Sequence, residues 1–76
     1  MKQKVTEIRE IVRANLIKCR KENGLTQTEV GMVIGKEKST VASWEQGKSM
    51  PDIDTLYRLA TYYHKTIGYM FGDEEQ

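Results

Sequence analysis

The chain has 76 residues, of which 38% are hydrophobic and 30% charged, so it is expected to form one small domain with a modest core. It has no run of about 18 apolar residues, which excludes a membrane-spanning helix, and its first ten residues lack the apolar segment of a signal peptide. One cysteine cannot form an internal disulfide. Together these features predict a reduced, cytoplasmic setting.

Charge is unevenly distributed along the chain, although the net charge is only +1. Residues 1–48 hold 10 of the 12 basic and 6 of the 11 acidic side chains, a balance of +4, and residues 49–76 carry −3. A basic half is what attraction to nucleic acid phosphates requires. The alternative is that these charges only solvate the surface.

A helix is predicted from about Thr6 to Asn23, after a flexible arm over residues 1–5. Apolar residues recur at i, i+4, i+8 and i+11 and form one buried stripe, namely Ile8, Val12, Leu16 and Cys19. Cys19 is therefore expected to be a small core residue. A reactive or metal-binding thiol is the alternative, but no second cysteine supports it. Gly24 ends the helix.

A short second helix is predicted from Gln27 to Ile34. Thr26 is a suitable N-cap, and Glu29 stands three residues on, where a capping box places an acid. Gly31 in mid-helix costs about 1 kcal/mol relative to alanine. This cost predicts that another helix passes too close at Gly31 for a side chain. Gly35 suits the left-handed conformation at the C-terminus.

A third helix is predicted from about Glu37 to Gln46, with Val41 and Trp44 facing the core and Gly47 as the stop. A loop follows, because Pro51 disfavours helix at the residue before it.

Met32 and Val33 fall outside the apolar stripe of the second helix. They are interpreted as scattered surface residues, with a partner contact as the alternative.

The fourth predicted helix runs from about Ile53 to Tyr63, capped by Asp52 or Asp54, with a stripe formed by Leu56, Leu59, Ala60 and Tyr63. A last short helix, 67–71, is capped by Thr66 and stopped by Gly72, and residues 73–76 are expected to form a flexible acidic tail. Some of Tyr69, Met70 and Phe71 must close the core, and any remainder is a possible homodimer patch.

The order of these residues resembles the Cro/C1-type, or XRE-type, helix-turn-helix DNA-binding domains. The resemblance covers most of the chain, and its matching segments are Gly24-Leu25-Thr26-Gln27, Val30-Gly31, Ile34-Gly35, Ser39-Thr40-Val41, Trp44 to Lys48, Pro51, Leu56 and Leu59-Ala60. It implies an all-α, five-helix, lambda-repressor-like domain occupying the whole chain, with a motif core at 12–72. It also implies sequence-specific binding of double-stranded DNA. At His64, where members of this family often carry Gly or Asn, it implies a positive φ, which His tolerates better than most residues.

The resemblance places the third helix in the DNA major groove as the recognition helix. It implies base contacts from Lys38, Ser39 and Ser43 on the outward face of this helix, and Ala42 lies on the same face. A solvated amphipathic helix is the alternative. Lys38 can donate to guanine, the serine hydroxyls can donate or accept, and Ala42 can meet a thymine methyl group.

Contacts to phosphate are expected on both sides of the recognition helix. The candidate phosphate contacts are Thr26, Gln27, Thr28, Lys36, Thr40, Gln46, Lys48 and Ser49. The resemblance also implies a partly buried structural ion pair between Arg20 and Glu45, which would join the first and third helices; two separately solvated charges are the alternative.

Two residues depart from the family pattern: Lys36 replaces a usual apolar turn residue, and Glu37 replaces a Ser or Thr cap. Glu37 brings a negative charge near DNA.

The expected function is a dimeric transcriptional repressor on a pseudo-palindromic operator. The alternative is an antitoxin-like or other protein-interaction module with weak DNA binding. No catalytic set, metal cluster, cofactor motif or small-molecule site is evident, so an enzyme is not expected.

Overall fold

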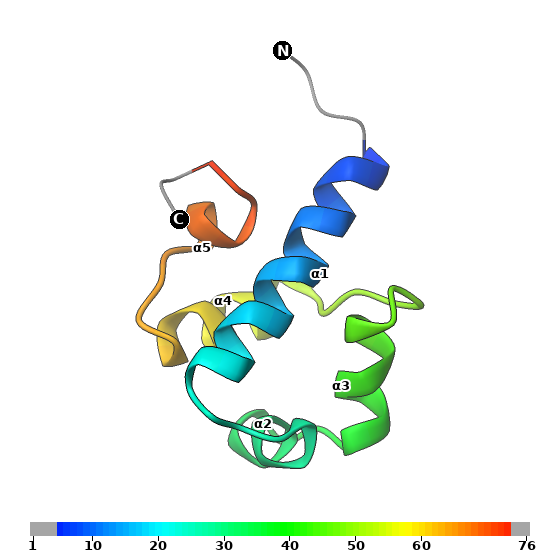
Figure 1. The fold of residues 1–76 in the computed structure, drawn as a ribbon, viewed down its shortest axis with the longest axis vertical. Coiled ribbons are helices and arrows are strands. Elements are labelled where there is room, and N and C mark those ends of the chain that lie inside the picture. The colour runs from blue at the N-terminus through cyan, green and yellow to red at the C-terminus, as the bar shows by residue number, and fades with distance from the viewer. Residues whose placement is uncertain (1–4, 74–76) are drawn as a thin grey trace.

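The computed structural model describes residues 5–73 and shows an all-α domain of five helices. They are α1 (Val5–Glu22), α2 (Gln27–Ile34), α3 (Lys38–Glu45), α4 (Ile53–Tyr62) and α5 (Ile67–Met70). In Figure 1, α1 crosses the front of the molecule, with α2 below it, α3 to one side and α4 behind it. Val5, expected in the arm, is the first residue of α1, whereas residues 1–4 and 74–76 lie outside the described part.

Short polar side chains cap α2, α4 and α5, as the sequence predicts. Thr26 and Glu29 form a capping box: the Thr26 hydroxyl accepts from the Glu29 N–H at 3.1 Å, and Glu29 accepts from the Thr26 N–H at 2.8 Å. Asp52, and not Asp54, caps α4 through the Thr55 N–H, and Thr66 caps α5. The hydrogen bond from Thr55 lowers the pKa of the Asp52 carboxyl.

Positive φ values occur where the sequence places a helix end. Gly24 and Gly35 have φ of 66° and 72°, and His64 has φ of 61° after α4. The Gly35 N–H donates to the Gly31 carbonyl, and so closes α2. These conformations turn the chain sharply enough to bring short helices together.

The prediction for Gly31 was right that there is no room for a side chain but wrong about the neighbour. A Cβ at Gly31 would overlap the backbone carbonyl oxygen of Lys36, in the turn between α2 and α3, and not another helix. The Lys36 N–H also donates to the Gly31 carbonyl at 2.8 Å. Glycine at position 31 therefore lets the helix-turn-helix turn fold back onto α2.

The core lies between α1 and the four shorter helices. It contains the predicted stripes and closes with residues of α5; its members are Val12, Leu16, Cys19, Val30, Ile34, Val41, Trp44, Leu56, Leu59, Ala60, Tyr63, Tyr69 and Met70. Buried Asn15 donates to the carbonyl oxygens of Tyr69 and Met70 at 3.1 and 3.2 Å, which ties α5 to α1. Burial raises the pKa of the Cys19 thiol, as expected of an unreactive core cysteine.

Tyr63 makes the stability of the core sensitive to alkaline pH. Its side chain is buried, and this burial raises the pKa of its hydroxyl from 10.0 to about 12. The folded state favours the neutral phenol, so this stabilisation is complete below pH 10 and is lost as the pH rises toward 12. We expect the thermal midpoint of the wild type to fall more steeply over this range than that of Tyr63→Phe. Parallel curves for the two proteins would contradict this expectation.

Candidate nucleic-acid interface

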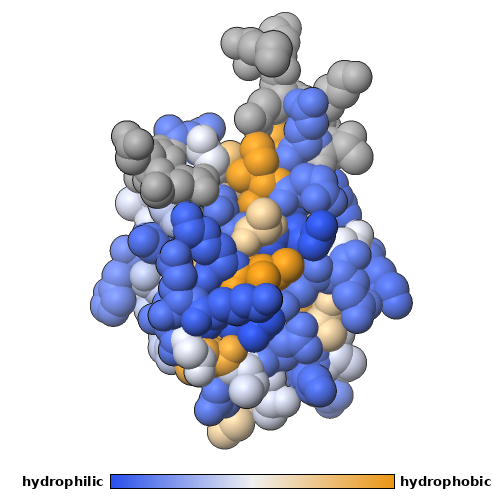
Figure 2. Space-filling model, in the orientation of Figure 1, coloured by the Kyte–Doolittle hydropathy of each residue, from blue (hydrophilic) through white to orange (hydrophobic). Residues whose placement is uncertain are grey.

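Helix α3, which the resemblance expects to be the recognition helix, has one buried face and one open face. Val41 and Trp44 are 2% and 5% exposed, and both pack into the core. Lys38 and Ser39, on the first turn, are exposed, while Thr40, Ala42 and Ser43 are half-buried. Figure 2 shows mainly hydrophilic residues on the side of the molecule where α3 lies. The first turn therefore offers the most accessible polar groups for base contacts.

Ser43 is held by the loop that follows α3. Its hydroxyl forms a 2.7 Å hydrogen bond with the hydroxyl of Ser49, and its carbonyl accepts from the Lys48 N–H at 3.0 Å. In this loop Gln46 and Lys48 are exposed and Ser49 is half-buried. The structure thus brings predicted base-contacting and phosphate-contacting residues together at the C-terminal end of α3. The serine pair fixes the loop relative to the helix.

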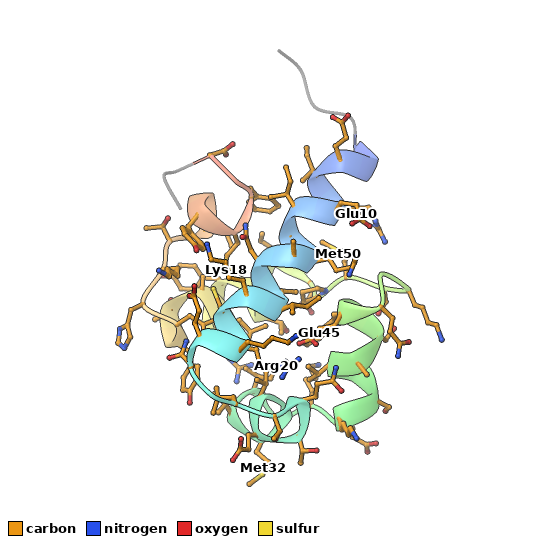
Figure 3. The ribbon with its side chains drawn as sticks, viewed as in Figure 1. Glu10, Lys18, Arg20, Met32, Glu45 and Met50 are labelled. Carbon is orange, nitrogen blue, oxygen red and sulfur yellow. The ribbon has the colours of Figure 1, made fainter. Side chains whose placement is uncertain are left out.

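An ion pair joins α1 to α3. The Arg20 Nε and Nη2 atoms donate to the two carboxylate oxygens of Glu45 at 2.7 and 2.9 Å, and Arg20 Nη1 donates to the Leu25 carbonyl at 2.9 Å. The Arg20 and Glu45 side chains are only 14% and 8% exposed. The hydrogen bond with Glu45 raises the pKa of the Arg20 guanidinium. Figure 3 shows the two residues facing each other between α1 and α3.

The side chain of Gln27 belongs to the same cluster. Its Nε2 atom donates to Glu45 Oε1 at 3.0 Å, so the first residue of α2 is linked to the last residue of α3. Gln27 was predicted only as a phosphate contact. An amide nitrogen has two N–H groups, so the bond to Glu45 leaves one for another acceptor.

The N-terminus of α2 presents backbone donors beside this cluster. The first intrahelical bond to Thr26 comes from Val30, so earlier amides of the first turn have no acceptor within the helix. Exposed Thr28 lies on this turn. The Thr26 hydroxyl accepts in the capping box, but its own proton remains able to point to an acceptor. This arrangement suits a phosphate.

The turn between α2 and α3 is exposed and carries charges of both signs. Lys36, Glu37 and Lys38 are all exposed. Glu37 occupies the N-cap position of α3 without a side-chain capping hydrogen bond. Its carboxylate therefore stabilises the N-terminus of α3 through its negative charge alone. In sequence it stands between two lysines.

Arg13 also contacts α3, although it was not predicted to belong to the site. Its Nη1 atom donates to the carbonyl oxygen of Glu45 at 3.0 Å, so a second arginine of α1 binds the end of α3. Arg13 and Arg20 are seven residues apart and share one face of α1. That spacing was the available signal.

A surface pocket of about 310 Å³ lies between α2 and α4, and no residue of α3 lines it. Its wall is formed by Val33, Ile34, Tyr57, Arg58, Thr61 and Tyr62. Val33, interpreted as a scattered surface residue, therefore shares an apolar depression with two tyrosines, whereas Met32 is 76% exposed. The pocket could not be seen in sequence because its two helices meet only in the fold.

Within residues 5–73, no helix combines the length and apolar composition needed to cross a bilayer. In the same residues, no three His, Cys, Asp or Glu side chains are grouped as metal ligands.

Known proteins share both the sequence pattern and the fold. A family model, HTH_3, described as helix-turn-helix, matches residues 16–70. The HTH-type transcriptional regulator y4dJ of Sinorhizobium fredii is 39% identical over 54 residues, covering 71% of this chain and 70% of that protein. The cryptic phage CTXphi transcriptional repressor RstR of Vibrio cholerae is 36% identical over 56 residues, covering 74% of this chain and 50% of that protein.

Two transcriptional regulators of known structure share the fold of this chain. A transcriptional regulator from Listeria innocua superposes with a TM-score of 0.77 at 34% identity, covering 86% of this chain and 61% of its own. An HTH_3 family regulator from Vibrio cholerae has a TM-score of 0.75 at 23% identity, which supports the fold. This chain thus spans less than two thirds of either solved protein. It belongs to the HTH_3 helix-turn-helix family of transcriptional regulators, as the XRE-type resemblance predicted.

Proposed function

We propose that this protein binds a specific double-stranded DNA site, with α3 in the major groove, and thereby represses transcription in the cytoplasm. The observation that carries the proposal is the double-faced α3: Val41 and Trp44 are buried, while Lys38 and Ser39 are exposed at its first turn. The Arg20–Glu45 pair fixes this helix against α1. A rigid helix with a polar outer face is the element that reads base edges.

Phosphate contacts are proposed at both ends of the recognition helix. The N-terminus of α2 supplies backbone amides with the side chains of Thr26, Gln27 and Thr28, and Lys36 lies in the following turn. Thr40, on the first turn of α3, and the loop residues Gln46, Lys48 and Ser49 complete the set. These contacts position the helix without reading sequence.

Repression is proposed because one relative, RstR, is named a transcriptional repressor. A repressor needs only to occupy its operator.

We further propose a homodimer on a two-fold symmetric operator, since half-sites one helical turn apart, about 34 Å, match two copies related by two-fold symmetry. Tyr69 and Met70 are buried in the core, so the predicted C-terminal dimer patch is reduced to half-buried Phe71. Sedimentation at tens of micromolar, with and without DNA, tests the dimer, and a mass of one chain in both cases contradicts it.

The first experiment is selection from a random duplex library at about 100 mM salt, followed by titration of the selected site against a scrambled duplex. A palindromic consensus preferred by 10³ or more, roughly the lower range for specific binders, supports the proposal. Weak, salt-sensitive binding without enrichment contradicts it. That outcome would favour a protein-interaction module and make Glu37 the first residue to replace.

Lys38 and Ser43 are expected to carry sequence preference. We expect Lys38→Ala to weaken binding to the selected site about tenfold and to relax the preference at one base pair. Ser43→Ala should also change the preference. Ser49→Ala is its matched control, because it breaks the same serine–serine hydrogen bond but should weaken all sequences equally. Unchanged affinity and preference in both Lys38→Ala and Ser43→Ala would show that α3 does not read the bases.

A further inference from the structure

We propose that Arg13 extends the DNA interface onto α1 as an additional phosphate contact, and that Glu10 competes with the phosphate for its guanidinium. The inference rests on the proposed function, because it adds a contact to the same DNA surface. Arg13 lies outside both the helix-turn-helix and the matched residues 16–70.

The fold places the Arg13 guanidinium at the loop proposed to follow the DNA backbone. Its Nη1 atom is 3.0 Å from the carbonyl oxygen of Glu45, the last residue of α3. A Cβ built on Gly47 would lie 3.3 Å from Arg13 Cδ and 3.6 Å from its Nε. The side chain therefore lies against the chain between Glu45 and Lys48. It also places a positive charge at the negative end of the α3 dipole.

The guanidinium keeps donors for a ligand. Arginine has five N–H donors. Three are engaged, since Nε and Nη2 donate to Glu10 at 3.4 and 3.2 Å and Nη1 donates to Glu45, and so two remain. The Arg13 side chain is 33% exposed. One edge of the guanidinium is thus anchored on α3, while donors on its open side suit the oxygens of a phosphate.

Glu10 is a weak partner that a phosphate can replace. Its side chain is 64% exposed, and both of its contacts to Arg13 are long. Such exposed pairs contribute little to stability, so Glu10 can turn into solvent at small cost. Figure 3 shows Glu10 on the side of α1 that faces α3 and the loop, whereas Lys18 lies on the other side. The carboxylate therefore occupies donors that a phosphate would use.

A double-mutant cycle tests the contact. Dissociation constants for the selected duplex and a scrambled duplex are measured by fluorescence anisotropy between about 50 and 300 mM salt. We expect Arg13→Gln to weaken both duplexes roughly fivefold at low salt and to reduce the slope of log K against log salt by about 0.9. Glu10→Gln should tighten binding about two- to threefold, and this gain should vanish in the double variant. Lys18→Gln is the control and should leave the slope unchanged.

Two results would overturn the inference while leaving the proposed function intact. The first is that folded Arg13→Gln keeps the wild-type salt slope. The second is that Glu10→Gln tightens DNA binding equally with and without Arg13, which would show that Glu10 acts on DNA through its negative charge and not by competing for Arg13. Circular dichroism checks that each variant folds. If Arg13→Gln does not fold, Arg13→Lys takes its place in the cycle, and the Glu10→Gln gain should then shrink because lysine lacks the planar fork. Failure of the wild type to bind either duplex would instead overturn the proposed function.

Discussion

Replacing Arg20 with alanine is expected to lower the free energy of unfolding by about 3 kcal/mol, because it leaves the buried Glu45 carboxylate without its cation. Glu45 is 8% exposed and would keep only the Gln27 amide as a side-chain donor. The Leu25 carbonyl would also lose a donor. Urea unfolding followed by circular dichroism measures the loss.

The chain offers a matched control in its second arginine–glutamate pair. Glu10 is 64% exposed, so Glu10→Ala should cost less than about 1 kcal/mol. The joint replacement Arg20→Met with Glu45→Leu should recover much of the loss, since it removes both charges and keeps the volume. Equal, small losses for Arg20→Ala and Glu10→Ala would mean that burial does not strengthen the Arg20–Glu45 pair.

Replacing Gly31 with alanine is the second large expected effect. The added Cβ would overlap the Lys36 carbonyl oxygen, a backbone atom that cannot turn aside like a flexible side chain. Overpacking costs about 3 kcal/mol at the upper end, and the helix propensity of alanine returns about 1, so a net loss of roughly 2 kcal/mol is expected. Because the turn leads into α3, DNA affinity should fall even under conditions where the variant remains folded.

Gly24→Ala separates crowding from backbone conformation. Gly24 has φ of 66°, and a Cβ there would meet nothing within 4 Å, so its substitution tests conformational strain alone. Gly24 also precedes α2, outside the turn into α3. We expect Gly24→Ala to lose stability while the folded fraction binds DNA normally. If Gly31→Ala likewise binds normally once its unfolded fraction is taken into account, the turn does not control the placement of α3.

Much of the helical framework could be predicted because it depends on local patterns. The Thr26–Glu29 capping box is set by neighbouring residues, and it was predicted from them. The positive φ of His64 was implied by the resemblance, and it is present. The apolar stripe of α1 follows from helical period alone. The predicted bounds of α2 match the observed ones. α3 was predicted one residue too long at each end, and α4 and α5 one residue too long at the C-terminal end, because the capping residues were counted with the helix. The prediction for α1 is shifted by one residue at both ends.

The site was predictable in part. The Arg20–Glu45 pair was expected from the resemblance and is present. The residues proposed to contact bases and phosphates remain proposals, but the fold adds restraints that sequence did not indicate. Gln27 joins the ion-pair cluster and Ser43 bonds to Ser49. These are contacts between residues of different elements, and no local spacing specifies them.

By itself, then, the sequence determined five helices, their caps and the order of a helix-turn-helix, because caps, glycines and apolar periods act within a few residues. Only the tertiary structure decided that the Lys36 carbonyl lies beside Gly31, that Gln27 joins the Arg20–Glu45 pair, and that Arg13 reaches the loop after α3. For the last two contacts the physical reason is distance along the chain: Arg13 and Glu45 are 32 residues apart, and only the packing of α1 against α3 brings them together.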